Sequence, residues 1–174
     1  MGKIADDWND QWRQRDAQIK ESGFARIDQA VAESIAEYSP LIEIGAGSGK
    51  LAEMIAAQGG DIIATDDYSG DYPFGTGDHF PVANMDARDA VLAYPDRNVL
   101  CSWPSYSHNW FTDACKEIET DIFLIYIGEG EGGCTPDEEF HPYLSQCFTH
   151  IQHIPMLQYY GIHDCCDVYK RNKK

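Results

Sequence analysis

Leu41-Ile42-Glu43-Ile44 runs directly into Gly45-Ala46-Gly47-Ser48-Gly49, and this stretch decides how the chain can fold. Pro40 ends any helix before it, so the short apolar run is typical of a buried strand. Glycines at alternate positions leave the backbone N–H groups of a turn open to close approach by a ligand. Leu51 to Gln58 then predicts a helix that Gly59-Gly60 ends. The stretch indicates a strand, a glycine loop and a helix, which together begin an α/β unit.

Three classes of ligand-binding loop share this strand–loop–helix geometry. A Walker A loop needs G-x-x-x-x-G-K-[S/T], but Gly45 lies one residue too close to Gly49-Lys50, and Leu51 stands where a magnesium-binding hydroxyl belongs. A dinucleotide loop needs G-x-G-x-x-G, but Lys50 occupies the position of the third glycine. The third class has an acid on the strand followed by three alternating glycines, and Glu43 with the three glycines fits it at every position.

The rest of the chain alternates between strand and helix patterns. Expected strands cover 61–66, 80–85, 98–103, 121–127, 148–154 and 167–171, and expected helices cover 6–21, 24–38, 87–94, 109–119 and a segment that Thr135 opens as N-cap. Residues 67–79 lack periodicity and predict an irregular loop. The pattern favours one α/β domain over 1–174, with N-terminal helices in 1–39 and the sheet core in 40–174. Its sheet is expected to be doubly wound, Rossmann-like and mostly parallel, with helices on both faces and room for an antiparallel C-terminal edge.

Two acidic positions downstream extend the pattern of the glycine loop. Asp66 and Asp67 end the second expected strand, and Asp86 with Ala87 follows the third. In this order of motifs the chain resembles class I S-adenosylmethionine (SAM)-dependent methyltransferases over residues 41 to 128. The resemblance implies that SAM is the cofactor and that Asp66 or Asp67 holds its ribose hydroxyls, while Asp86 and Ala87 meet adenine. The implied cofactor-binding residues are Glu43, Gly45, Ala46, Gly47, Gly49, Asp66, Asp67, Asp86 and Ala87.

The acids suit this cofactor on physical grounds. A carboxylate can accept hydrogen bonds from both ribose hydroxyls. SAM carries a sulfonium cation and no phosphate, so an acidic site that would be costly for NADP or ATP is tolerable for SAM. The chain as a whole has 29 acidic residues against 13 Lys and Arg, a formal charge of −16. This balance disfavours a polynucleotide partner, because nucleic acids are bound mainly through cationic side chains.

Ser102-Trp103-Pro104-Ser105-Tyr106 stands where amino-methylating members of the family carry [D/N/S]-P-P-[Y/F/W]. The resemblance makes Ser102, Trp103, Pro104 and Tyr106 the candidate catalytic residues on the acceptor side. The match is partial, because Trp103 takes the polar position and its side chain cannot accept a hydrogen bond. We expect Trp103 and Tyr106 to form an aromatic wall beside the Ser102 hydroxyl. The alternative is that both rings only pack at a strand end.

Other chemistry-bearing residues lie near the same expected sheet edge. Glu129 and Glu131 follow the most apolar strand, and either could meet a substrate or belong to a solvated loop. His163-Asp164 precedes the last strand as a candidate oriented base, with a plain turn as the alternative. His150 and His153 suggest no metal site, and we expect no metal.

These observations predict a SAM-dependent methyltransferase that acts on a small molecule or a protein side chain. Two alternatives remain: a SAM-binding regulatory or sequestering protein that transfers no methyl group, and a nucleic-acid methyltransferase completed by a partner subunit. No apolar run approaches the roughly 20 residues that span a bilayer, and the N-terminus lacks a signal-peptide core. A cytoplasmic protein is therefore expected. The acceptor and the oligomeric state are left open.

Overall fold

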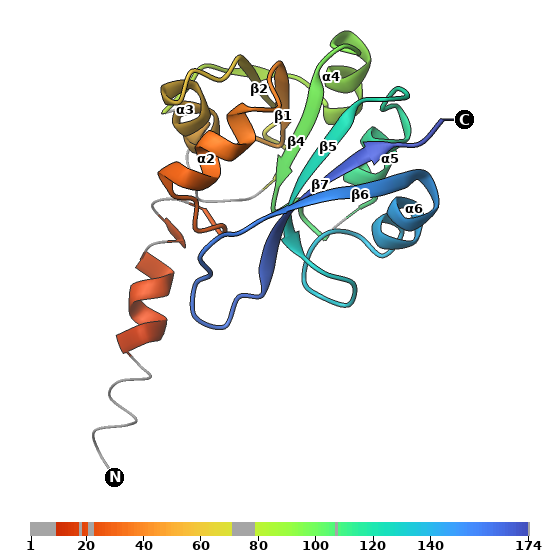
Figure 1. Ribbon diagram of the computed structural model, residues 1–174. Helices are drawn as coiled ribbons and strands as arrows, with labels where there is room; N and C mark the ends of the chain where they lie inside the picture. The colour runs from red at the N-terminus through yellow and green to blue at the C-terminus, as the bar shows by residue number, and fades with distance from the viewer. Residues whose placement is uncertain (1–9, 18, 21–22, 71–78, 107, 174) are drawn as a thin grey trace.

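The structure, a computed structural model, describes residues 10–17, 19–20, 23–70, 79–106 and 108–173. Its centre is a seven-stranded sheet of order β3-β2-β1-β4-β5-β7-β6 (Figure 1). The strands are β1 (Leu41–Ile44), β2 (Ile62–Asp66), β3 (Val82–Asn84), β4 (Asn98–Ser102), β5 (Phe123–Glu129), β6 (Phe148–Ile154) and β7 (Asp164–Arg171). The first five are mutually parallel, whereas β7 runs antiparallel to β5 and β6 antiparallel to β7. The predicted mostly parallel sheet with an antiparallel C-terminal edge is confirmed.

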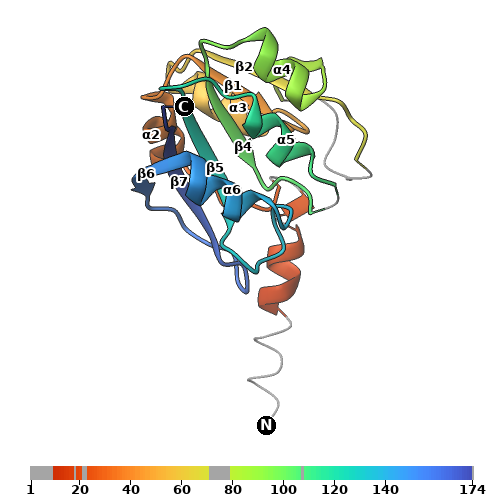
Figure 2. The same ribbon diagram turned by 90° about the vertical axis from the view of Figure 1, so that its right-hand side faces the viewer.

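Helices cover both faces of the sheet, as the doubly wound prediction requires. On one face lie α2 (Gln29–Ala36) and α3 (Lys50–Ala57), whose apolar side chains pack on alternate residues of the strands. On the other face lie α4 (Ala87–Ala93), α5 (Trp110–Lys116) and α6 (Phe140–Cys147). Figure 2 shows the two layers from the side, with α2 and α5 on opposite sides of the strands. The alternation explains the burial of β1, because Leu41 faces the first layer and Ile42 the second.

Strand β5 has the longest run of buried residues in the sheet, five in succession. Its apolar run, 121–127 in the sequence analysis, suits an interior strand of a parallel sheet that is covered on both faces. It is central, but only β4 pairs with it in parallel, and β7 pairs with it antiparallel. A long apolar run predicts coverage on both faces and does not specify the direction of its neighbours.

Two expected helix starts are wrong. We predicted a helix over 24–38, but α2 begins at Gln29, because the Asp28 carboxylate accepts a hydrogen bond from Val31 N at 3.0 Å and caps the helix there. Thr135 was expected to cap α6, yet the helix begins at Phe140 with Glu139 as N-cap. The Thr135 hydroxyl instead donates a hydrogen bond to the Pro104 carbonyl.

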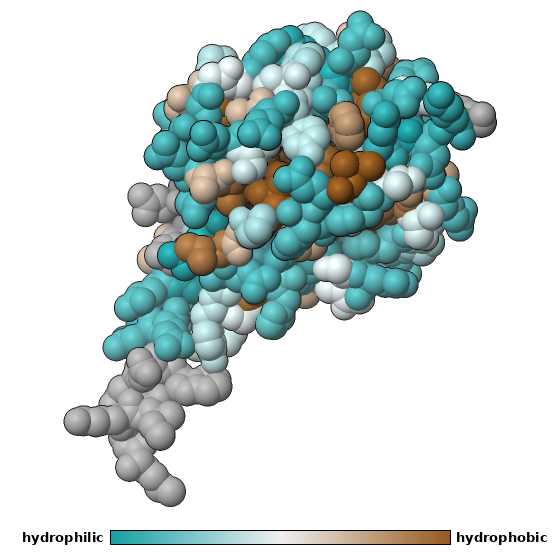
Figure 3. Space-filling model, viewed as in Figure 1, coloured by the Kyte–Doolittle hydropathy of each residue, from teal (hydrophilic) through white to brown (hydrophobic). Residues whose placement is uncertain are grey.

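The other expected elements hold where the structure describes them. Residues 10–17 and 19–20 are helical within the predicted 6–21 helix, and residues 67–70 form no regular element. Part of the predicted irregular loop, 71–78, lies outside the described residues. Among the described residues, no helix is long and apolar enough to cross a membrane. The face seen in Figure 3 is largely hydrophilic, and its apolar atoms gather in the middle, between α2 and β6.

Candidate functional site

A cavity of about 790 Å³ opens at the carboxyl ends of β1, β2, β3 and β4. This edge is where ligands bind in open α/β sheets, because the chain winds away from β1 in both directions and leaves a crevice between the loops. The volume lies within the range of small-molecule sites. The predicted residues that line it are Glu43, Gly45, Ala46, Gly47, Asp66, Asp67, Asp86, Ala87, Ser102, Trp103 and Pro104.

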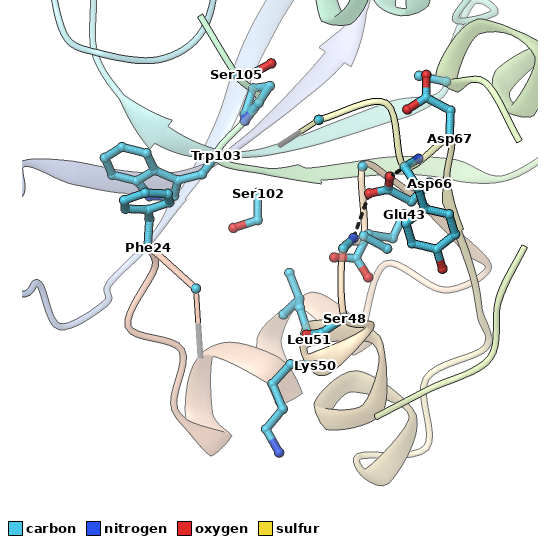
Figure 4. Close-up of a pocket in the computed structure, with 18 of the residues that line it drawn as sticks. Phe24, Glu43, Ser48, Lys50, Leu51, Asp66, Asp67, Ser102, Trp103 and Ser105 are labelled. Carbon is cyan, nitrogen blue, oxygen red and sulfur yellow. Dashed lines mark hydrogen bonds between the residues drawn. The ribbon is translucent and has the colours of Figure 1, made fainter. Parts of the chain in front are cut away.

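The glycine loop forms one wall of the cavity and is tied to the end of β2. Gly47 N donates to Asp66 Oδ2 at 2.7 Å, and Tyr68 N donates to Asp66 Oδ1 at 2.7 Å (Figure 4). Gly47 has a φ of 54°, and no atom lies within 4 Å of the place its Cβ would occupy. The loop is therefore held by Asp66 in a left-handed conformation that suits glycine, with open space beside Gly47 for a ligand.

Gly49 is a glycine for a different reason. Its φ is 76°, and a Cβ there would lie 2.9 Å from Phe80 Cβ, so the position is filled by packing against the segment before β3. Gly49 is the N-cap of α3 but has no side chain to cap the helix, and it does not line the cavity. Of the three loop glycines that we expected to bind cofactor, this one has a packing role.

Glu43 is the most unusual titratable group in the cavity wall. It is 2% exposed on β1, and its Oε2 has no hydrogen-bond partner among the described residues. Burial and, to a smaller extent, the nearby Asp66 charge raise the pKa of the Glu43 carboxyl to about 8, although a hydrogen bond from the Ala52 backbone N–H opposes the shift. Ala52 lies in the first turn of α3, so Glu43 takes up a helix-terminal N–H that Gly49 cannot satisfy.

The acids that end β2 and β3 are partly engaged in local structure. Asp67 is exposed, and its Oδ1 accepts from Ser69 N at 2.9 Å. Asp86 is the N-cap of α4, and its Oδ1 accepts from the N–H groups of Arg88 and Asp89. In each case only one carboxylate oxygen is used in these hydrogen bonds.

Aromatic residues form the other end of the cavity. The Trp103 and Phe24 rings stack with centroids 5.0 Å apart and planes inclined by 27°. Figure 4 shows this pair on one side, Glu43 and Asp66 on the other, and Ser102 between them. Trp110 lines the cavity too, with its ring edge 3.0 Å from the position of a Gly45 Cβ. Of the two rings expected to form an aromatic wall, only Trp103 lines this cavity, and Phe24 and Trp110 line it with Trp103.

Tyr106 lies outside this cavity. Its ring is 49% exposed, and its hydroxyl donates to Glu138 Oε1 at 2.7 Å. It lines a second cavity of about 280 Å³ that Glu131 and His141 also line. The structure therefore brings Ser102, Trp103 and Pro104 to the first cavity and separates Tyr106 from them.

The other candidate residues near this edge of the sheet make hydrogen bonds that hold loops and side chains in place. Glu129 accepts hydrogen bonds from Cys134 N and His163 N, so its carboxylate joins two loops. Asp164 is 2% exposed and accepts a hydrogen bond from Trp103 Nε1 at 3.0 Å, while the exposed His163 ring does not line the cavity. The structure does not form the oriented base that we considered for His163-Asp164.

Sequence reasoning missed Phe24 and Trp110 as cavity residues. Both were placed on apolar helix faces, because the periodicity of aromatic residues does not separate a core position from a pocket wall. For Phe24 a signal was available: Asp28 is a strong N-cap residue, and a helix that begins after it leaves 24–27 as a non-helical approach to the site.

Comparison with known proteins finds similar folds among solved structures. No family model and no curated protein matches the chain. Its structure is similar to magnesium protoporphyrin IX methyltransferase (ChlM) of Synechocystis PCC 6803, which is described with bound SAM (TM-score 0.55, 11% identity, 94% of this chain and 90% of that chain). It is also similar to the O-methyltransferase TomG of Streptomyces achromogenes, involved in tomaymycin synthesis and described in complex with SAM (0.53, 16%, 86% and 82%).

A third similar structure is an rRNA methylase of Streptococcus thermophilus (TM-score 0.51, 13% identity, 86% of this chain and all of that chain). The three proteins differ in acceptor, so the shared architecture does not specify one. Each of the three matches covers more than four fifths of this chain. The chain therefore has the Rossmann-like fold of class I SAM-dependent methyltransferases.

Proposed function

We propose that the chain is a SAM-dependent methyltransferase that acts on a small molecule or a protein side chain. One observation carries the proposal: a single cavity joins a glycine-rich, acidic end to an aromatic end. A transferase needs both ends in one space, because its two reactants must meet in line with water excluded.

The acidic end has the donor and acceptor groups that SAM would require. Gly45, Ala46 and Gly47 would let the cofactor approach the backbone, and Asp66 or Asp67 would accept from its ribose hydroxyls. Asp86 and Ala87, at the end of β3, would border the adenine. The buried Glu43 oxygen without a partner would gain one from a cationic or hydrogen-bond-donating group of the ligand.

The aromatic end would hold the acceptor. When bound, SAM supplies an electrophilic methyl group on its sulfonium. The Ser102 hydroxyl has no hydrogen-bond partner among the described residues and lies between the two ends (Figure 4), where it can orient a nucleophile. Trp103, with Phe24 and Trp110 beside it, would pack on the acceptor and keep water from the transferred group.

The charges of the lining residues favour a neutral or cationic acceptor. Asp66, Asp67 and Asp86 line the cavity, against Lys50 among the Lys and Arg residues that the structure describes. A phosphate or carboxylate would meet net repulsion there, whereas a flat or cationic group would gain from the aromatic faces. ChlM and TomG are described with small-molecule chemistry, which supports this class of acceptor for the present chain.

The proposal is tested by calorimetry with SAM and with S-adenosylhomocysteine, its demethylated product. Gly47→Val would fill the open space beside the loop and should abolish binding of both compounds. Gly132→Val is a matched control, because Gly132 also has a positive φ of 86°, has no atom within 4 Å of its Cβ position, and lies outside the cavity. The control should bind like the wild type. Equal affinity in both variants would show that the glycine loop does not bind the cofactor.

A second measurement separates an enzyme from a binding protein. SAM consumption is followed with candidate planar amines and phenols as acceptors, by mass spectrometry of both products. Methyl transfer that fails in Gly47→Val supports the enzyme. Tight SAM binding with no consumption by any acceptor or by cell extract would favour a sensing or sequestering protein instead.

A further inference from the structure

We propose that Asp164 is a positioning residue that fixes the plane of the Trp103 indole, so that Trp103 and Phe24 form a stacking platform for a planar acceptor. This inference rests on the proposed methyltransferase function. It assigns a role to Asp164, which lies at the start of β7, far along the chain from the glycine loop and from the acceptor motif. Three features of the structure support it.

The first feature is the hydrogen bond between strands. Trp103 Nε1 donates to Asp164 Oδ2 at 3.0 Å, from the end of β4 to the start of β7. Asp164 is 2% exposed, and burial raises the pKa of its carboxyl, against the lowering effect of the Trp103 hydrogen bond. Its carbonyl accepts from Gln158 Nε2, which ties the residue to the loop before β7. A buried acceptor held in this way is costly to leave without its donor, so the indole orientation is strongly determined.

The second feature is the backbone at Trp103. Its φ is 53°, a left-handed value that a bulky residue rarely adopts, and Trp103 N donates to the Ile127 carbonyl at 2.7 Å. Such a conformation persists where the surroundings over-determine it, and this occurs most often at ligand sites. The turn sends the indole away from the path of β4, toward Asp164 and Phe24.

The third feature is the stack itself. Phe24 comes from the segment between Gly23 and α2, and both Phe24 and Trp103 line the cavity. The indole is thus held at its N–H by Asp164 and at a ring face by Phe24. A wall with two fixed aromatic rings favours flat ligands, because stacking requires matched planes and little rearrangement on binding. Lining carboxylates add a preference for a planar cation over a planar anion.

The test uses the indole N–H signal of Trp103 in the full-length protein. In ¹⁵N NMR spectra, assigned with Trp103→Phe, this proton should be protected from exchange in the wild type and exposed in Asp164→Ala. Asp164→Asn keeps an oxygen acceptor and should retain the protection. Asp167→Ala is the matched control, because Asp167 is also on β7 but contacts His150 and His153.

The probe is N-methylquinolinium, a planar cation, compared with the non-planar cation cyclohexylammonium. Quinolinium should shift the Trp103 signal, and its Kd should rise about fivefold in Asp164→Ala and in Phe24→Ala, with no more than about a twofold change in Asp164→Asn and Asp167→Ala. Cyclohexylammonium should bind more weakly and respond little to these changes. Should Asp164→Ala not fold, Trp103→Phe, which keeps a ring but loses the N–H, is expected to weaken quinolinium binding to a similar extent.

Quinolinium binding that leaves the Trp103 signal unmoved, or equal losses in Asp164→Asn and Asp164→Ala, would overturn the proposal. SAM affinity is measured in the same variants and should stay within about twofold of the wild type, because Asp164 and Phe24 act at the other end of the cavity. If the wild type fails to bind SAM while the Trp103 results hold, the methyltransferase proposal fails and the aromatic platform stands.

Discussion

At the scale of single residues, Glu43 makes the stability of the protein depend on pH. Its pKa is raised from 4.5 to about 8, so between these values the folded protein holds a proton that the unfolded chain has released. The free energy of unfolding therefore falls as pH rises through this window, by up to about 1.4 kcal/mol for each unit of pKa shift. Glu43→Gln removes the titration and keeps a group that can accept from the Ala52 N–H.

We expect Glu43→Gln to be more stable than the wild type at pH 9, with the difference shrinking toward pH 5. Urea unfolding of the ligand-free protein at pH 5, 7 and 9 measures it. Asp67→Asn, a change at an exposed acid in the same cavity wall, is the control and should show no such trend. A constant difference between Glu43→Gln and wild type across this range would contradict the raised pKa.

Asp66 and Asp67 are adjacent acids, and their different surroundings predict different contributions to SAM binding. Asp66 is partly buried and bonds the N–H groups of Gly47 and Tyr68, whereas Asp67 is exposed and bonds only Ser69 N among the described contacts. Asp66→Ala should weaken SAM binding by about 1.5–3 kcal/mol, because charged hydrogen bonds to the ribose and the support of the loop are lost together. Asp67→Ala should change it much less. Calorimetry that gives the reverse order would move the ribose contact to Asp67.

At the scale of elements, the sequence predicted regular structure better than it predicted how the elements end. Strands β1, β2 and β4 and helices α3 and α4 were expected within two residues of their observed bounds, because apolar runs, Pro40 and paired glycines mark them clearly. The start of α2 was misjudged because Phe24 and Ile27 continue its apolar spacing, although Asp28 caps the helix after them. Thr135 was misjudged because its hydroxyl contacts Pro104, a tertiary partner that no local pattern encodes.

The candidate site also has one part that could be predicted from the sequence and one part that could not. The glycine loop and the acids after β2 and β3 could be placed from sequence, because parallel strands bring their carboxyl ends to one edge. At the aromatic end the sequence placed Trp103 but not the residues around it, since this end joins residues 24, 103, 110 and 164 across the whole chain. Tyr106 illustrates the limit: its spacing matches a motif, but the loop directs its ring to Glu138 and the second cavity.

The turn from β1 into α3 contains one glycine that is required for packing, Gly49, and one that has open space beside it, Gly47, and this difference can be tested. Both Gly47 and Gly49 have positive φ, so an alanine at either position carries backbone strain of about 1–3 kcal/mol. At Gly49 the new Cβ would also press on Phe80, and overpacking adds a similar cost. Gly49→Ala should therefore lower the free energy of unfolding more than Gly47→Ala. Urea unfolding without ligand measures both variants. Equal losses in the free energy of unfolding would show that the Phe80 side chain can move away from the new Cβ at little cost.

At the scale of the whole molecule, net charge and the aromatic cavity point to the same class of acceptor. A formal charge of −16 opposes association with phosphate backbones, whose binding depends on Lys and Arg that release counterions. The similar fold of an rRNA methylase does not alter this balance, because a fold shared at 13% identity does not carry over a binding surface. An exocyclic base amine would also lack a side-chain acceptor at Trp103, where the indole N–H is a donor that Asp164 already uses.

We therefore expect the purified protein to leave no labelled methyl group on DNA or RNA at physiological salt, although it consumes SAM with a small planar acceptor. The assay is filter retention of label from methyl-labelled SAM, repeated at low salt, because an electrostatic encounter would strengthen there. Gly47→Val gives the background in each condition. Robust methylation of a polynucleotide that falls steeply as salt rises would contradict the prediction. It would also indicate a cationic surface sufficient for phosphate contacts, despite the 29 acidic residues of the chain.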